Sequence, residues 1–247
     1  MDRIRAKTAF KAYVGKYNIE NINIRLKIDH TYRVAQFCER ISKSLTENAS
    51  DIELAWLLGL LHDIGRFEQL KRYNTFVDKD SIDHADLGAD ILFSNGLIYE
   101  FIDEQGVFPL IEAAIRFHNK LKVPEDLDEN TLAFTNILRD ADKCDIFRVI
   151  CEPPFDGRAR AILASPEPAR DLVMNCIKEH RCVPRTFTTT PFESLLSQCC
   201  LAFELVFDES RGIVKEQGYL NRLMNIKLMS PLREQMDFLR EELREYI

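Results

Sequence analysis

The sequence predicts an all-α protein, and three observations support this fold class. Long stretches repeat apolar residues at intervals of three and four positions, which is the spacing of a helix with one buried face. The nine glycines and nine prolines are spread thinly over 247 residues, so few positions interrupt a helix. No segment alternates apolar and polar residues over a strand-like length. With 46% hydrophobic residues, the chain has enough apolar material for a core.

The first two predicted helices have recognisable starts or ends. Residues 25–45 form an apolar face that turns His30 toward the interior. Ser50-Asp-Ile-Glu53 fits a capping box that opens a second helix, which is apolar almost all round through Leu61. Gly65 then offers a natural break. The second helix is therefore expected at the centre of the fold.

Three more helices are predicted before residue 150. Residues 70–80 are rich in charge and are expected to form a loop. After this loop, helices are expected over residues 81–94 with His84, from a first turn at Pro109 to His118, and over residues 131–150 with Asp142.

The helical pattern is interrupted after Cys151. Residues 152–170 contain four prolines, so we expect a boundary between a core of residues 1–150 and a C-terminal helical extension of residues 151–247. The extension is expected to pack on the core, although a groove for a partner helix or a homodimer surface is equally open. Its helices are predicted over residues 167–180, after the capping box Thr190-Pro-Phe-Glu193, and from residue 219 to the end with a restart at Ser230-Pro231.

Composition and charge exclude several classes of protein. A formal net charge of −7 argues against a broad basic surface for duplex nucleic acid. The N-terminus lacks the apolar run of a secretory signal, and no segment has the length of a membrane span, so we expect a soluble cytoplasmic protein. Seven cysteines without CxxC spacing indicate reduced, buried thiols, not a disulfide framework or a structural zinc site.

Four of the five histidines fall on core-facing positions or at the ends of separate predicted helices. One such histidine alone would be an ordinary core residue. Several buried polar side chains together need a partner that compensates for their lost hydration, and a metal centre is that partner. The candidate ligands are His30, His62, Asp63, His84, His118 and Asp142.

Imidazole nitrogens mixed with carboxylates suit divalent transition metals, namely Fe, Mn, Co, Ni or Zn, with Mg as an additional candidate. Six ligands exceed the needs of one tetrahedral zinc. They suffice for two ions about 3.5–4 Å apart that share Asp63. Such a pair activates water and stabilises charge on oxygen, so hydrolysis of a phosphate ester is the reaction that fits best.

His30, His62-Asp63 and Asp142 within LRDADKCD also carry a family resemblance. In this order they resemble the H…HD…D pattern of the HD superfamily of metal-dependent phosphohydrolases, over approximately residues 25–150. Asp140 and Asp142 are both candidates for the last ligand, and Asp142 is favoured because the family pattern places this ligand in an Ala-Asp dipeptide. The resemblance implies an all-helical core of about five helices with the ligands at its centre. It also implies hydrolysis of nucleotides or other small phosphate esters.

His84 and His118 extend the pattern to H…HD…H…H…D. This is similar to the bimetallic branch that includes HD-GYP cyclic-dinucleotide phosphodiesterases and diadenosine-polyphosphate hydrolases. The chain lacks Gly-Tyr-Pro after the HD pair and has His118-Asn119 where HD-GYP proteins have paired histidines, so a cyclic dinucleotide is not the expected substrate. By this resemblance, His30, His62, Asp63 and Asp142 hold one metal, and His84 and His118 complete the other with Asp63 shared.

A phosphate substrate calls for positive groups beside the metals. Arg66 and Lys143 are the leading candidates for binding the phosphoryl group and stabilising its charge during catalysis, alongside Asp63. Each of these cations could instead be an ordinary solvated group at a helix end or surface. The further substrate-binding candidates at the pocket mouth are Lys71, Arg72 and Lys120.

Two other functions fit the same residues. The six-ligand pattern also resembles HD-type di-iron oxygenases, which use O₂ to cleave carbon–carbon or carbon–phosphorus bonds. A non-catalytic HD module that binds a nucleotide is the third hypothesis. It is less favoured because the full ligand set is present.

Overall fold

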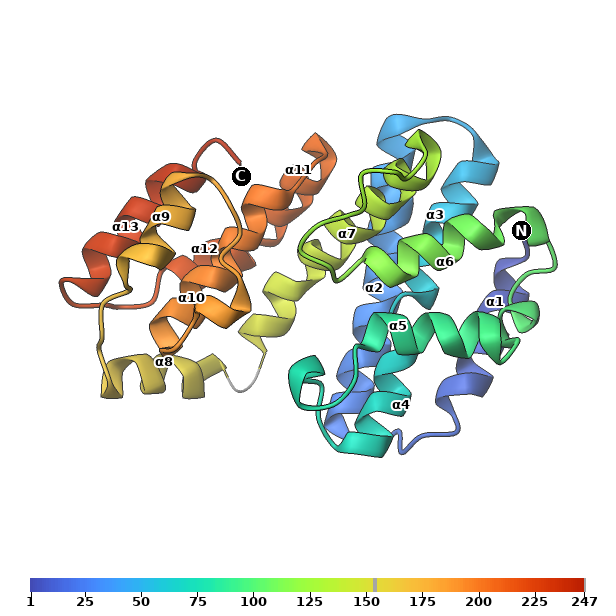
Figure 1. The fold of residues 1–247 in the computed structure, drawn as a ribbon, viewed down its shortest axis with the longest axis horizontal. Coiled ribbons are helices and arrows are strands. Elements are labelled where there is room, and N and C mark those ends of the chain that lie inside the picture. The colour runs from blue at the N-terminus through green and yellow to red at the C-terminus, as the bar shows by residue number, and fades with distance from the viewer. Residues whose placement is uncertain (153–154, 247) are drawn as a thin grey trace. The chain divides into compact units, whose positions relative to one another are not determined.

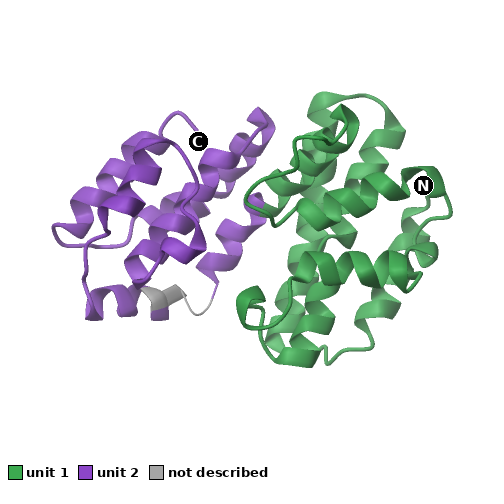
Figure 2. Ribbon diagram, viewed as in Figure 1, with its two compact units in different colours: residues 1–142 green, residues 143–247 purple. Residues whose placement is uncertain are grey.

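Helices without strands build residues 1–152 and 155–246, the part of the chain that this computed structural model describes (Figure 1). The all-α prediction is confirmed. The chain divides into two compact units, Met1–Asp142 and Lys143–Ile247 (Figure 2). The change of unit falls inside one continuous helix, α7, because this helix runs on to Cys151. The division was expected at residue 150 because a proline-rich segment comes after it. Pro153 and Pro154 of that segment lie outside the described residues.

The first unit contains six complete helices and most of a seventh within its described residues. A short 3₁₀ turn at Asp78–Asp80 joins α4 to α5. The helices are α1 (Arg3–Val14), α2 (Ile22–Leu45), α3 (Ala49–Leu61), α4 (Ile64–Tyr73), α5 (His84–Ala89), α6 (Phe108–Phe117) and α7 (Glu129–Cys151).

Two glycines let helices of the first unit approach each other at backbone distance. In α3, a methyl group added at Gly59 would lie 2.5 Å from the Cα of Ala35 in α2. In α4, one added at Gly65 would lie 2.1 Å from the carbonyl oxygen of His84 in α5. The α2–α3 and α4–α5 pairs are therefore packed without intervening side chains at these points, which brings residues at the helix ends close together.

Several predicted boundaries are wrong in detail. Asn48, not Ser50, caps α3, because the Asn48 side chain accepts the Ser50 N–H at 3.0 Å. The break falls at His62-Asp63 and not at Gly65, which lies inside α4. Helix α4 continues to Tyr73, so the predicted loop begins only at Asn74, and it contains the 3₁₀ turn at Asp78–Asp80. The helix expected over residues 81–94 is α5 followed by a π-helical turn at Asp90–Ser94.

The second unit has its own buried core. Thr190 caps α10 as predicted, and its hydroxyl accepts the Glu193 N–H at 3.1 Å. The proline-rich segment contains a helix, α8, and α1 and α11 are helices that the periodicity analysis did not identify. The helices are α8 (Phe155–Ala164), α9 (Asp171–Lys178), α10 (Pro191–Cys199), α11 (Asp208–Gln217), α12 (Tyr219–Met224) and α13 (Leu232–Leu243).

All seven cysteines are buried, as expected. Within residues 1–152 and 155–246, no helix combines the length and the apolar character that crossing a bilayer requires.

Candidate metal centre

The ligand candidates lie where helices of the first unit begin or end, or on their buried faces. His62 and Asp63 occupy the junction between α3 and α4, so their adjacent side chains leave the backbone where one helix stops and the next starts. His84 opens α5, and His118 follows the last residue of α6. The other two are internal helix residues, His30 in α2 and Asp142 in α7.

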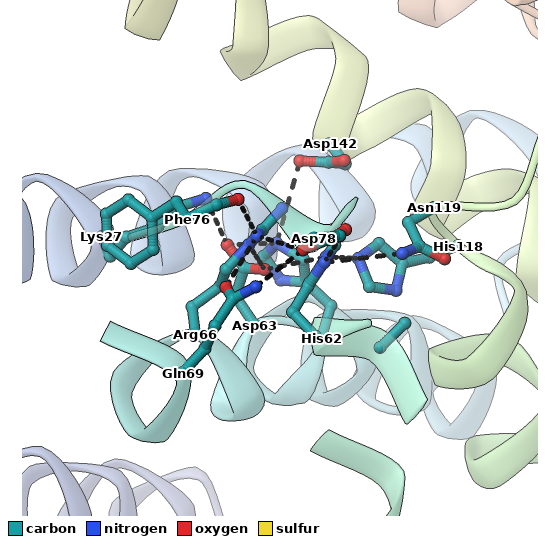
Figure 3. Close-up of polar contacts among 12 residues, drawn as sticks. Lys27, His62, Asp63, Arg66, Gln69, Phe76, Asp78, His118, Asn119 and Asp142 are labelled. Carbon is teal, nitrogen blue, oxygen red and sulfur yellow. Dashed lines mark hydrogen bonds and ion pairs between the residues drawn. The ribbon is translucent and has the colours of Figure 1, made fainter. Parts of the chain in front are cut away.

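One group of metal-donor atoms, meaning ring nitrogens and carboxylate oxygens that could bind an ion, lies around His30 and His62. Their Nε2 atoms lie 3.3 Å apart, and Asp63 Oδ2 lies 3.5 Å from the first and 3.4 Å from the second. Asp142 Oδ1 lies 3.0 Å from His30 Nε2 and 3.8 Å from His62 Nε2. Figure 3 shows Asp142 reaching this group from α7. The ligand atoms of His30, His62 and Asp63 lie within 4.8 Å of one another, close enough together to hold one ion.

A second group uses the other oxygen of Asp63. Asp63 Oδ1 lies 3.6 Å from His84 Nε2, which in turn lies 3.2 Å from His118 Nε2. The three ligand atoms of this group lie within 4.8 Å of one another. Asp63 therefore presents one oxygen to each group, which is the arrangement of a carboxylate shared between two ions.

Contacts of the far ring nitrogens decide which nitrogen of each histidine faces the site. His62 Nδ1 lies 2.8 Å from the Gly59 carbonyl, and His118 Nδ1 lies 2.6 Å from the Ile115 carbonyl. His84 Nδ1 lies 2.8 Å from Asp78 Oδ2. Carbonyl and carboxylate oxygens accept hydrogen bonds, so each Nδ1 carries the proton and donates it. In the neutral form of each ring, Nε2 then presents a lone pair toward the site.

The protonation of the site agrees with this assignment. Burial lowers the pKa of His118 to about 3, assisted by His84 and His62, and burial followed by the Arg66 cation lowers the pKa of His84. Both rings are therefore neutral near pH 7 in the metal-free protein.

The two carboxylates of the ligand set stay ionised. Burial alone would raise the pKa of Asp63, but Lys27 and His62 hold it well below its usual range. Burial acts in the same direction on Asp142, and the hydrogen bond from His30 with the nearby imidazoles holds its pKa low as well. Both groups are therefore anions near neutral pH.

The facing lone pairs of His84 and His118 show whether these residues suit a metal ion. Neither Nε2 can donate to the other when both Nδ1 atoms carry the protons, so 3.2 Å between them is not a hydrogen-bond contact. Two buried acceptors that face each other need a cation between or beside them. Neutral imidazoles with an ionised carboxylate are the donors that divalent transition metals prefer. The residues fit such ions.

Asp78 orients His84 and is a functional residue that the sequence analysis missed. Its Oδ2 accepts from His84 Nδ1, and its Oδ1 accepts from Arg66 Nη1 at 2.7 Å and from Gln69 Nε2 at 2.8 Å. Arg66 Nη1 also donates to the Phe76 carbonyl at 2.7 Å. A carboxylate behind a metal-binding histidine fixes the ring and raises its basicity. An aspartate six residues before a candidate ligand was the available signal, but the region was predicted only as a charged loop.

We expect Asp78→Asn to weaken metal binding at the His84–His118 group by about 10–100-fold, because the amide cannot accept from His84, Arg66 and Gln69 as a carboxylate does. Titration of metal-depleted protein with Mn²⁺, followed by elemental analysis, measures this effect. The matched control is Asp80→Asn, which removes an exposed carboxylate from the same turn. Equal metal affinity in both variants would contradict the role of Asp78.

A third group of donors, Asp78, Asp83 and His84, is already balanced by side-chain cations. Lys120 Nζ lies 2.7 Å from Asp83 Oδ2 and 2.9 Å from Asp86 Oδ2. Arg66 neutralises Asp78. This group is therefore an ion-pair network that lies next to the ligand set and holds His84 through Asp78.

The structure places the other predicted cations at different points. Arg66 Nε lies 3.6 Å from Asp63 Oδ1, so Arg66 lies beside the ligand set with Nη1 held by Asp78. Lys143 belongs to the second unit, where its Nζ lies 3.3 Å from Glu204 Oε2. Lys71 lies over the Tyr17 ring, and Arg72 pairs with Glu68 at 2.7 Å. Substrate binding by Arg66, Lys143, Lys71, Arg72 and Lys120 stays a prediction.

Lys27 is a second residue that the sequence analysis missed. Its Nζ lies 2.6 Å from Asp63 Oδ2 in a buried setting. It lies three residues before His30 on α2, so both side chains leave the same face of the helix. This spacing was the signal in the sequence, but a lysine on an apolar helix face is usually an extended surface residue.

Comparison with known proteins agrees with this geometry. Residues 28–146 match the family model of the HD domain, and the matched range contains all six ligand candidates. No curated protein and no solved structure gives a match to the chain. Residues 28–146 therefore carry an HD domain, and their cluster of histidines and aspartates is compatible with a metal site of that family.

Proposed function

We propose that this protein is a metal-dependent phosphohydrolase that acts on a nucleotide or another small phosphate ester with two divalent transition metals. The observation that carries the proposal is Asp63, whose Oδ2 faces His30 and His62 while its Oδ1 faces His84. A carboxylate placed in this way can be shared by two ions. His118 and Asp142 complete the two donor groups.

Each protein group has a definable task in this proposal. The bound metals would supply a water that is deprotonated near neutral pH and positive charge for the oxygens of the phosphoryl group. The hydrogen bonds of His62 and His118 to carbonyls hold both rings with Nε2 toward the site. Asp78 does the same for His84. These rings need no rotation when substrate arrives, and such preorganisation is a large part of electrostatic catalysis.

The test starts from elemental analysis of protein depleted with a chelator and reloaded separately with Mn²⁺, Fe²⁺, Co²⁺, Ni²⁺ or Zn²⁺. We expect two equivalents of metal per chain. We also expect release of inorganic phosphate from members of a panel of phosphomonoesters, phosphodiesters and nucleotides, lost on chelation and restored by metal.

Other outcomes point to other functions. Substrate-dependent O₂ uptake by the iron-loaded protein, with no phosphate release, would replace hydrolysis by oxygenase chemistry. Nucleotide binding without turnover under any metal would favour a binding module. A wild-type protein that binds only one equivalent of metal, with the same metal content after replacement of His84, would contradict the shared role of Asp63.

A further inference from the structure

Lys27 lies among the ligand residues without being a ligand itself. Only 8% of its surface is exposed, although its side chain ends in an ammonium group. Its Nζ lies 2.6 Å from Asp63 Oδ2, and Figure 3 shows Lys27 and Phe76 on one side of Asp63, opposite His118. The contact places a positive charge at the edge of the donor set.

The partners of Lys27 differ from those of the neighbouring cations. Within residues 1–152 and 155–246, its ammonium contacts Asp63 and, at 5.8 Å, the ring of Phe76. Lys120, in contrast, pairs with Asp83, and Arg66, which lies 3.6 Å from Asp63 Oδ1, is also held at 2.7 Å by Asp78, a carboxylate outside the ligand set. An ammonium has three donors, so Lys27 retains hydrogen-bonding capacity that the described contacts do not use.

The acceptor of Lys27 is also a ligand atom. Asp63 Oδ2 is the oxygen that lies 3.5 Å from His30 Nε2 and 3.4 Å from His62 Nε2. An ion held by this group would draw on the same oxygen, and this would weaken the bond of Asp63 Oδ2 to Lys27. A buried ammonium that loses its acceptor is costly, so it needs another anionic partner.

We propose that Lys27 binds a phosphoryl oxygen of the substrate at the edge of Asp63 that faces His30 and His62. This inference rests on the proposed function, because it takes the anion to be a phosphoryl group. The ammonium would donate to an oxygen that is not attacked, and hold the group against the donor set. Lys27 is then the substrate-binding cation at this edge, while Arg66 holds the Phe76–Asp78 segment in place.

A purely structural role for Lys27 leads to different results. If Lys27 only neutralises Asp63, its removal frees Oδ2 for a cation. Metal affinity then rises and phosphate binding does not change. If Lys27 binds phosphate, its removal weakens phosphate binding at equal metal occupancy.

The experiment measures binding of inorganic orthophosphate to the metal-loaded protein by calorimetry, with metal content determined on the same samples. We expect Lys27→Met to weaken orthophosphate binding by about 10–100-fold, the range for a hydrogen bond to a charged group. Lys27→Arg is expected to retain more affinity than Lys27→Met because the charge remains. Lys43→Met is the matched control, because Lys43 is an exposed residue of the same helix.

Orthophosphate binding that is unchanged in Lys27→Met would overturn the inference, as would a metal-loaded wild-type protein that binds no orthophosphate. Lys27→Gln gives the same comparison if Lys27→Met does not fold. The proposed function can fail separately. A wild-type protein that turns over no phosphate ester, yet binds orthophosphate through Lys27, would reject hydrolysis and leave the anion site standing.

Discussion

Replacing Asp63 by asparagine is expected to lower kcat/KM for phosphate esters by ~10²–10⁴-fold. Loss of a residue that merely orients one ligand costs about 10–100-fold in metal affinity or activity. Asp63 contacts both donor groups, through Oδ2 to His30 and His62 and through Oδ1 to His84. Its loss therefore affects both metal positions at once.

The physical reason lies in charge as well as in geometry. An amide presents one neutral oxygen and an N–H₂ group. At least one of the two groups of metal ligands would therefore face a hydrogen-bond donor in place of a carboxylate oxygen. Lys27, 2.6 Å away and buried, would also lose its carboxylate partner. We therefore expect metal content below two equivalents, together with reduced thermal stability of the metal-free protein.

Elemental analysis and phosphate release on the same samples measure both effects. Asp126→Asn is the control, because Asp126 is an exposed carboxylate in the segment between α6 and α7. An Asp63→Asn protein with two metal equivalents and wild-type turnover would show that Asp63 does not join the two groups.

The sequence was sufficient to predict the helices that have one buried face. Helices α2, α6 and α7 were predicted close to their observed limits because their apolar residues recur with the period of the helix. The ligand candidates could be named for the same reason. A histidine at a core-facing position needs a partner, and several such histidines need a common one.

Contacts that depend on tertiary structure could not be predicted in this way. Asp78 reaches His84 across a turn whose course no periodicity defines. Lys27 meets Asp63 only because α2 and the α3–α4 junction are packed together. Both residues are charged, and a charged residue in a sequence is first interpreted as solvent-exposed.

The glycines show a related limit. Gly65 was predicted as a helix break, because glycine is common where helices end. In the structure it lies inside α4, and its function is to allow close approach to α5. The sequence showed that a side chain was absent there. It did not show which neighbouring backbone required that absence.

Gly65→Ala is expected to destabilise the first unit by about 3 kcal/mol, at the upper end of the cost of overpacking a core. The added methyl group would lie 2.1 Å from the His84 carbonyl oxygen and 2.7 Å from the Gly88 backbone nitrogen. Both obstacles are backbone atoms, so a side-chain rotation cannot relieve the contact. The two helices must separate, and this moves His84 away from Asp63.

Urea unfolding followed by tryptophan fluorescence measures this effect, because Trp56 is the one tryptophan of the sequence and is buried in α3 of the first unit. The control is Gly106→Ala in the same unit, where an added methyl group meets no atom within 4 Å. Removing chain flexibility at such a position stabilises by about 0.4–1 kcal/mol. The two alanine substitutions should therefore shift the unfolding midpoint in opposite directions. If Gly65→Ala unfolded at the wild-type urea concentration and kept full metal content, the close packing of α4 on α5 would not be what positions His84.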